Sequence, residues 1–313
     1  MNIVFFGTSE FAMPALERLV DSKHKMSAVV TQPDRKRGRS LKLSPPPVKV
    51  LAMTKGIPVY QPLDASSAES AGYLSGLRAD LFVVISFGQI LNDKILSIPK
   101  LYPINLHGSC LPKYRGAAPT NWAIINGEKS SGVTVIKMNE RMDEGDIILK
   151  REINIDDEDT NITLTEKLSE LGAKTLLEAI DFIEKDKNLT FTKQDAGEAT
   201  YAPKLKKEDG LINWRDEAAV IHNKVRGLIP WPGAYTHYEG KVIKVLKTGI
   251  SCCRAFREAA PGEVIDILKD KGIIVCTGSG AIAITHLQLE GKKAMDADSF
   301  VRGHKISKGC LLS

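Results

Sequence analysis

Residues 1–31 read MNIVFFGTSEFAMPALERLVDSKHKMSAVVT, and this stretch decides the fold class. Asn2 to Phe6 is a short apolar run of the kind found in a buried strand, and Gly7 ends it. Apolar residues then recur at helical spacing from Phe11 to Val20, before a second strand-like run from Met26 to Thr31. The order strand, helix, strand predicts a β-α-β unit.

The same alternation continues along the chain. A helix is predicted from about Thr163 to Lys185. Further strand-like runs are Pro58–Tyr60, Leu81–Ser86, Tyr102–Leu106 and Gly132–Lys137, and helical patterns at Gln89–Leu96 and Pro119–Asn126 lie between them. This alternation predicts an α/β fold, a doubly wound and mostly parallel sheet with helices on both faces. Ligands of such a sheet bind beyond the carboxyl ends of its strands.

The chain is long enough for two domains, since 313 residues with 43% apolar composition can bury a large core and a smaller one. We predict a first domain over residues 1–188 and a linker over 189–205, where the sequence is polar and poor in large apolar residues. Residues 206–313 break into short alternating runs separated by Gly and Pro. They predict a smaller β-barrel, OB-like, of a type often used to hold nucleic acid.

The net charge of +5 is unevenly distributed. Residues 1–205 carry 26 Lys+Arg and 26 Asp+Glu, whereas residues 206–313 carry 17 and 12. A basic C-terminal third favours a polyanionic partner, although a soluble surface that happens to be basic explains it equally well.

Several classes of protein are disfavoured. The N-terminus has no signal-peptide pattern, and no apolar stretch approaches the roughly 18 residues of a membrane span. The five cysteines include no C-x-x-C pair, so we expect a cytoplasmic protein with neither a disulfide framework nor a metal site. The turn G-T-S-E-F lacks the further glycines of a dinucleotide fingerprint, and no P-loop is present.

The candidate chemistry begins at Ile104-Asn105-Leu106-His107-Gly108-Ser109. Side chains alternate along a strand, so Asn105 and His107 share one face at the carboxyl end of a predicted strand. The turn-rich loop from Ser109 to Pro119 follows, and a second turn, M-D-E-G-D at residues 142–146, offers a carboxylate. From the residues alone, Asp143, Glu144 and Asp146 all compete for that role.

These motifs resemble those of the formyltransferases that use 10-formyltetrahydrofolate, and most of all those of the methionyl-tRNA formyltransferase family. The resemblance rests on Asn105 with His107, on S-x-L-P-x-Y-R-G-A-A-P and on Asp143 in M-D-x-G-D. It extends from G-T-S-E-F-A through T-Q-P-D-R and P-P-V-K-V to G-K-K-A-M, nearly the whole chain. The family pattern favours Asp143 as the carboxylate and implies a Rossmann-like catalytic domain.

The resemblance implies transfer of a formyl group to the amino group of methionyl-initiator-tRNA, by direct attack of the amine. Asn105 and a protonated His107 would donate to the tetrahedral oxyanion, and Asp143 would hold the imidazole and assist proton transfer. Cys110 lies in the same loop, where a nucleophilic role can be imagined. We expect it to be only a small loop residue, because the acceptor amine is itself a competent nucleophile.

The resemblance also implies the location of the folate co-substrate. The candidate contacts follow two predicted strands: Phe87, Gly88, Gln89, Ile90 and Leu91, and Ser109, Leu111 and Pro112. The family's usual Y-G-x-I-L-P reads F-G-Q-I-L-N here, so the location carries over but individual side-chain bonds do not.

A basic segment after the second predicted strand is the candidate tRNA contact. It reads as a long mobile loop whose basic residues are Arg35, Lys36, Arg37, Arg39 and Lys42, and a solvated charge run is the alternative. In the family this loop holds the acceptor end, with the arginine matching Arg39 most important. Additional phosphate contacts are predicted from Lys206, Lys207, Lys244 and Lys247, with Arg226, Lys241, Lys292 and Lys293 as further candidates.

Other interpretations remain open. The same chemistry on a purine-pathway amine or an amino sugar nucleotide would use the same three residues, and a non-enzymatic RNA-binding protein is a more distant alternative. Trp231, between two prolines, is predicted to be a core anchor rather than a base-stacking residue. A monomer suits the family.

Overall fold

The computed structural model describes residues 1–37, 42–186, 189–251 and 259–313. They form two compact units. Unit 1 comprises Met1–Pro119, Ser130–Ile153 and Thr165–Ala202, and unit 2 comprises Thr120–Lys129, Asn154–Leu164 and Pro203–Ser313. The limits predicted at residues 188 and 206 stay a prediction, because the two units interleave along the chain.

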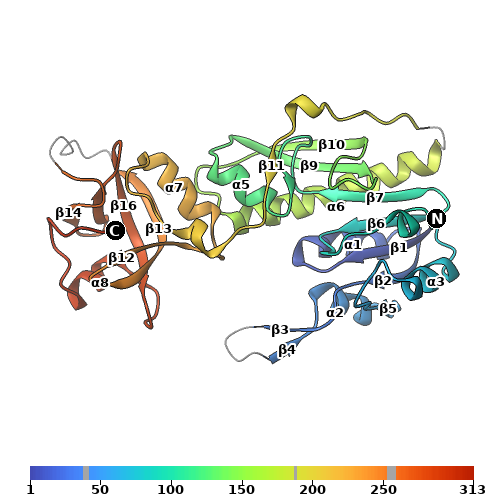
Figure 1. The fold of residues 1–313 in the computed structure, drawn as a ribbon, viewed down its shortest axis with the longest axis horizontal. Helices are drawn as coiled ribbons and strands as arrows, with labels where there is room; N and C mark the ends of the chain where they lie inside the picture. The colour runs from blue at the N-terminus through green and yellow to red at the C-terminus, as the bar shows by residue number, and fades with distance from the viewer. Residues whose placement is uncertain (38–41, 187–188, 252–258) are drawn as a thin grey trace. The chain divides into compact units, whose positions relative to one another are not determined.

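Unit 1 is built on a sheet that has seven strands among the described residues, in the order β10-β9-β7-β6-β1-β2-β5 (Figure 1). Its strands are β1 (Asn2–Gly7), β2 (Lys25–Val30), β5 (Val59–Tyr60), β6 (Leu81–Ile85), β7 (Tyr102–His107), β9 (Ser130–Lys137) and β10 (Ile147–Asn154). Strands β5, β2, β1, β6 and β7 pair in parallel, and β9 runs antiparallel to β7. The predicted doubly wound, mostly parallel sheet is confirmed.

The middle of the sheet is buried on both faces. All five residues of β6 are buried, and the ring of Phe6 packs against those of Phe82 and Phe87. A strand covered on both sides needs a continuous apolar run, which is why β1 and β6 are so evident in the sequence. The chain leaves β1 toward β2 on one side and reaches β6 on the other, so the strand order reverses between β1 and β6. Such a switch point opens a crevice at the carboxyl ends of the strands.

The α-helices described between residues 1 and 186 are α1 (Met13–Val20), α2 (Pro47–Thr54), α3 (Ala68–Gly76), α4 (Asp93–Leu96), α5 (Pro119–Ile125) and α6 (Asn161–Lys185). The predicted helix over 89–96 begins only at Asp93. Gly88 has φ +85°, and the Asn92 side chain accepts a hydrogen bond from the backbone N–H of Ile95 at 3.1 Å. Asn92 is therefore the N-cap, and the residues before it form a loop.

The basic segment after β2 differs from the loop predicted for it. Strands β3 (Arg35–Arg37) and β4 (Lys42–Ser44) form an antiparallel hairpin. The side chain of Arg37 and the whole of Arg39 lie outside the described part of the chain. The described arms are extended ribbon because Arg35 pairs with Ser44 and Arg37 with Lys42 along the backbone.

Unit 2 contains an antiparallel sheet in the order β12-β13-β16-β15-β14, with β17 paired to β16. Its elements are α7 (Ala218–Gly227), β12 (Ala234–Tyr238), β13 (Lys241–Ser251), β14 (Val264–Leu268), β15 (Gly272–Cys276), β16 (Ala281–Leu289), β17 (Met295–Asp296) and α8 (Ala297–Gly303). The last residues of the chain bind to both edge strands of this sheet. On β12 the N–H of His237 donates to the Ser313 carbonyl at 2.6 Å, and on β14 the N–H of Val264 donates to the Cys310 carbonyl at 2.8 Å. The sheet is thereby closed into a small barrel.

Two expectations for unit 2 were wrong. Trp231 is 55% exposed, in the turn between α7 and β12, and the tryptophan that enters the core is Trp214. Arg226 is buried on α7, where its Nη1 donates to the Asp159 carbonyl at 2.6 Å. Its guanidinium satisfies backbone carbonyls and is not presented to a phosphate.

The segment predicted as a linker is attached to unit 1. Strand β11 (Tyr201–Ala202) pairs in parallel with β8 (Arg115–Gly116), and the N–H of Tyr114 donates to the Thr200 hydroxyl at 2.9 Å. Within the described residues, no helix is long and apolar enough to cross a membrane.

Candidate active site

Strand β7 directs Asn105 and His107 to the same face of the sheet. The residues that alternate with them, Ile104 and Leu106, are buried on the other face. Leu106 packs against α6 at Gly172, where an added Cβ would lie 2.8 Å from a Leu106 methyl carbon. The absence of a side chain at Gly172 therefore lets α6 lie close to β7 and hold the strand that carries the two polar residues.

Asp143 joins them from the turn between β9 and β10. Its Oδ1 lies 3.3 Å from the Asn105 Nδ2 and 3.5 Å from the His107 Nδ1. The backbone N–H of Gly116 donates to its Oδ2 at 2.8 Å. The side chains of His107 and Asp143 are only 7% and 12% exposed. Residues 105, 107 and 143 thus meet in one place, although the chain between them is long.

The other acids of the turn do not lie beside His107. The Glu144 carboxylate pairs with Arg115 at 3.1 Å and with Arg141 at 3.5 Å. Asp146 contributes its backbone carbonyl, which accepts from the N–H of Lys137 at 2.9 Å. The geometry therefore distinguishes Asp143 from Glu144 and Asp146, which the sequence alone left in competition.

The hydrogen-bond partners of His107 fix its ring. Nε2 lies 2.9 Å from the carbonyl oxygen of Tyr114. A carbonyl oxygen can only accept, so Nε2 carries a hydrogen. Nδ1 is then the nitrogen that faces Asp143 and the site.

Two residues that sequence analysis missed hold the Asp143 turn. Gln194 donates through Nε2 to the carbonyl oxygens of Asp143 at 2.8 Å and Gly145 at 2.7 Å. Its Oε1 accepts from Nε and Nη2 of the buried Arg115 at 3.1 and 2.9 Å. Gln194 lies in the polar stretch expected to be a linker, where nothing in the local sequence indicates a role. Arg115 belongs to the S-x-L-P-x-Y-R-G-A-A-P motif, but the sequence does not indicate that its guanidinium binds Gln194.

The residues predicted to bind folate lie in two loops next to these strands. Phe87 and Leu91 are buried, and Gln89 uses both ends of its amide on the backbone of Ala65 and Pro62, at 2.7 and 3.2 Å. Ile90 is 78% exposed. In the other loop, Leu111 is buried, Ser109 donates to the Lys113 carbonyl at 2.6 Å, and Pro112 follows a cis peptide bond.

The residues predicted to contact tRNA are mostly exposed. This holds for Arg35, Lys36 and Lys42 of the hairpin and for Lys206, Lys207, Lys244 and Lys247 of unit 2. On β13, Lys244 stands opposite Gln288 and Lys247 opposite His286, both on β16. Lys247 also lies 4.0 Å from Glu158.

One group of described residues has metal-ligand types close together. The ligand atoms of His24, Asp181 and Glu184 lie within 4.8 Å of one another. The Lys23 ammonium contacts both carboxylates, and the N-terminal ammonium lies 3.8 Å from Glu184. These cations, next to the first residues of β2, already balance the acids.

The chain matches known families over most of its length. Residues 1–180 match the model described as formyl transferase, and residues 204–305 match that of the formyl transferase C-terminal domain. A methionyl-tRNA formyltransferase of Citrifermentans bemidjiense is 49% identical over 313 residues, which cover all of this chain and 96% of that protein. One of Geobacter metallireducens is 46% identical over 312 residues, covering 98% of that protein. The chain belongs to the methionyl-tRNA formyltransferase family.

Solved structures of other proteins share the fold of this chain. The sugar 3N-formyl transferase WlaRD superposes with a TM-score of 0.69 at 20% identity, covering 94% of this chain and 99% of that one. HypX of Aquifex aeolicus, solved with tetrahydrofolic acid, gives a TM-score of 0.65 at 19% identity, covering 96% of this chain and 46% of that one. The predicted family, fold class and enzyme class of this methionyl-tRNA formyltransferase family member are confirmed.

Proposed function

We propose that the protein transfers the formyl group of 10-formyltetrahydrofolate to the free amino group of methionyl-initiator-tRNA. One observation carries the proposal: the Asn105 Nδ2 and the His107 Nδ1 both lie within 3.5 Å of the same carboxylate oxygen, Oδ1 of Asp143. This arrangement lies in a chain whose full-length relatives are methionyl-tRNA formyltransferases.

The chemistry requires donors for a developing negative charge. The amine of the aminoacyl group attacks the formyl carbon and forms a C–N bond, and the formyl oxygen becomes an oxyanion. Asn105 Nδ2–H and a protonated Nδ1 of His107 donate to that oxygen. Asp143 takes a proton from the attacking amine through a water. The oxyanion then collapses, the bond from the formyl carbon to the folate nitrogen breaks, and the proton held by Asp143 returns through the water to that nitrogen.

The transfer is direct, without a covalent enzyme intermediate. The candidate nucleophile of the loop that follows His107 is Cys110, and burial together with the nearby charge of Glu152 raises its pKa to about 11. The thiol is therefore neutral at physiological pH, and a neutral thiol is a poor nucleophile. A formylated side chain trapped by rapid quench would contradict direct transfer.

The folate would lie along the loops that follow β6 and β7. Most side chains of the predicted set, Phe87, Gln89, Leu91, Ser109 and Leu111, support the fold. The contacts of these loops with the pterin would therefore come from backbone groups near Gly88 and Pro112 and from the exposed Ile90. Gly88, at φ +85°, permits a close approach of the backbone.

The tRNA would be held by the basic hairpin and by the lysines of unit 2. Arg39 lies outside the described residues, and the family assigns it the largest effect. Arg39→Ala should weaken use of aminoacyl-tRNA far more than binding of folate. Equal losses toward both substrates would argue against this assignment.

The identity of the acceptor is tested by competition between substrates. With 10-formyltetrahydrofolate as donor, the protein is offered charged initiator tRNA, charged elongator tRNA, an amino sugar nucleotide and a purine-pathway amine. We expect efficient formylation of the initiator tRNA alone. Preferential formylation of a small amine would replace this proposal, and binding of tRNA without turnover would indicate a non-enzymatic role. We further propose a cytoplasmic monomer, which sedimentation of the purified protein tests for its oligomeric state.

A further inference from the structure

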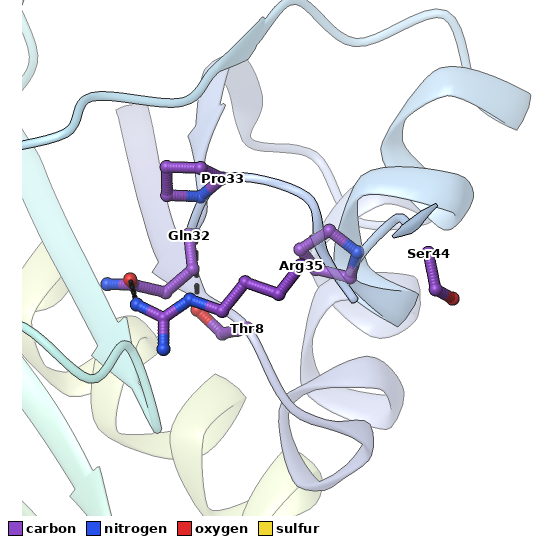
Figure 2. Close-up of a pocket in the computed structure, with 6 residues that line it drawn as sticks. Thr8, Gln32, Pro33, Arg35 and Ser44 are labelled. Carbon is purple, nitrogen blue, oxygen red and sulfur yellow. Dashed lines mark hydrogen bonds between the residues drawn. The ribbon is translucent and has the colours of Figure 1, made fainter. Parts of the chain in front are cut away.

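The base of the basic hairpin encloses a small pocket that the chemistry above does not use. It has a volume of about 80 Å³ and is lined by Thr8, Gln32, Pro33, Arg35, Ser44 and Pro46 (Figure 2). This volume exceeds by several times what one water molecule needs, and it suits a group the size of a phosphate. The pocket lies where β1 and β2 end, beside the crevice at the switch point of the sheet.

Arg35 supplies the only cationic group among the lining residues. Its Nη2 donates to the Oε1 of Gln32 at 2.8 Å, and Figure 2 shows its side chain extended toward that amide. Among the described residues, no carboxylate lies within ion-pair distance of its guanidinium. Its positive charge is therefore held in place by a neutral partner and is not compensated.

The neighbouring acid is occupied elsewhere. Both carboxylate oxygens of Asp34 accept from the Lys49 Nζ, at 2.8 and 2.9 Å, and Oδ1 also accepts from the Gln61 amide at 2.8 Å. The Gln61 hydrogen bond and then Lys49 hold the pKa of Asp34 below its ordinary value. Asp34 therefore stays charged but is already balanced, which leaves Arg35 free for an anion.

Gln32 is fixed as firmly as a core residue. It is 6% exposed, and its Nε2 has no hydrogen-bond partner among the described residues. Because a guanidinium can only donate, the amide oxygen must face Arg35 and the amide nitrogen must point away. The backbone holds the residue as well: its carbonyl accepts from Gln61 at 2.8 Å, and its N–H donates to Thr8 at 3.4 Å. A buried amide with one end unsatisfied is costly, and its oxygen positions the arginine.

We infer that this pocket binds a phosphate of the tRNA acceptor strand through Arg35, and that Gln32 is the residue that positions the arginine. The Thr8 hydroxyl is committed elsewhere, because it donates to the Phe87 carbonyl at 2.8 Å, so Arg35 is the donor on which the site depends. The inference rests on the proposed function and deepens it. A phosphate of the RNA is favoured over a carboxylate of the folate because the pocket is lined by residues at the foot of the hairpin, which also carries the exposed Lys36 and Lys42.

The test separates position from charge. In Arg35→Ala the cation is lost. In Gln32→Ala the cation remains without its anchor, and in Gln32→Glu it stays anchored but is neutralised. Lys25→Ala is the matched control. It removes an exposed positive charge at the first residue of β2, the strand that leads to Gln32 at its other end. KM for methionyl-tRNA, KM for 10-formyltetrahydrofolate and kcat are measured between 50 and 200 mM KCl, about the range over which phosphate contacts weaken.

We expect Arg35→Ala to raise KM for methionyl-tRNA about tenfold and to reduce the slope of log KM against log salt by roughly 0.7 to 0.9, the share of one phosphate contact. Gln32→Glu should reduce the slope similarly, and Gln32→Ala should raise the same KM with a smaller change of slope. KM for folate and the Lys25→Ala values should stay within about twofold of wild type.

Other outcomes overturn the inference. A change in KM for folate that matches the change for tRNA would assign the pocket to the folate carboxylates. An unchanged salt slope in Arg35→Ala would remove the phosphate contact. Should Gln32→Ala unfold, the Gln32→Glu and Arg35→Ala proteins decide alone. Failure of the wild-type protein to formylate methionyl-tRNA would instead refute the proposed function, and uncharged tRNA binding measured across the same salt range would still test the pocket.

Discussion

Asp143 occupies the left-handed region of backbone space, with φ +56°. Few residues other than glycine adopt it readily, and aspartate and asparagine are the most tolerant of them. The turn thereby aims the carboxylate at Asn105 and His107, while Gly116 holds its second oxygen. Asparagine fits the same backbone conformation, so a substitution can remove the charge and keep the turn.

We therefore expect Asp143→Asn to fold normally and to lose about a hundredfold or more in kcat, because the proton acceptor and the partner of the imidazole are both lost. Single-turnover formylation measures the chemical step. Asp146→Asn, in the same turn, is the matched control and should stay within about threefold of wild type. Similar losses in both variants would mean that the turn needs acidity in general, not a carboxylate at position 143.

Cys110 offers a second prediction about a single residue. Its Sγ lies in the space beside Gly132, where an added Cβ would be 2.4 Å away, and burial raises its pKa to about 11. Cys110→Ala should retain kcat within about threefold, because a neutral, half-buried thiol takes no part in the transfer. Intact protein should also resist alkylation at this position at pH 8. Loss of turnover in a folded Cys110→Ala protein would reopen a nucleophilic role.

Among the elements, the segment that follows α6 matters most for the site. Gln194 connects the carbonyl groups of the Asp143 turn with the buried Arg115, and thus joins segments that lie far apart in the sequence. Gln194→Ala should lower kcat about tenfold and leave KM for both substrates nearly unchanged, because it loosens the carboxylate without touching a substrate. Lys193→Ala, the exposed neighbour, is the control. A rise in KM that accounts for the whole loss would show a role in binding instead.

Helix α7 contributes a pH-dependent term to stability. His222 lies within it, its Nδ1 2.9 Å from the Thr248 hydroxyl, and burial followed by the nearby Arg226 charge lowers its pKa below 6.5. As pH falls through 6.5 the unfolded chain takes up a proton that the folded chain resists. The free energy of unfolding should therefore decrease below about pH 6.5.

Replacing this histidine isolates its contribution from that of His24, whose pKa burial also lowers. His222→Gln should show a smaller loss of stability between pH 7 and 5.5 than wild type, as measured by urea unfolding at each pH. Parallel curves for the two proteins would mean that His222 does not titrate differently on folding.

The elements also show what the sequence could and could not predict. The strands of the parallel sheet were predictable because burial on both faces demands uninterrupted apolar runs, as in Leu81–Ile85. The helix start at Asp93 was missed because a cap at Asn92 outweighs the apolar spacing before it. Asn105 and His107 could be paired by strand alternation alone. Gln194 could not, since its contact with Asp143 joins residues 51 apart and depends on tertiary packing.

At the scale of the whole molecule, the two units do not follow one another in sequence. Segments 120–129 and 154–164 belong to unit 2 although the catalytic sheet surrounds them along the chain. Three contacts bind them there: Asn121 Nδ2 donates to the Gly227 carbonyl at 2.7 Å, Trp122 Nε1 to the Pro203 carbonyl at 2.9 Å, and Arg226 Nη1 to the Asp159 carbonyl at 2.6 Å. Gly227 is itself required, since an added Cβ would lie 2.7 Å from Ile125.

A chain truncated after Ala202 should therefore not be a stable catalytic domain, because it keeps two segments of unit 2 without the rest of that unit. It would expose the apolar surface of segments 120–129 and 154–164 to water, and it would lose the arginine that binds the Asp159 carbonyl. We expect this protein to aggregate or to unfold at a clearly lower temperature than the full chain, as measured by sedimentation and calorimetry. Coexpression with residues 203–313 is the control and should restore solubility. A truncated protein that is monomeric and unfolds cooperatively near the temperature of the full chain would show that the catalytic sheet is stable without unit 2.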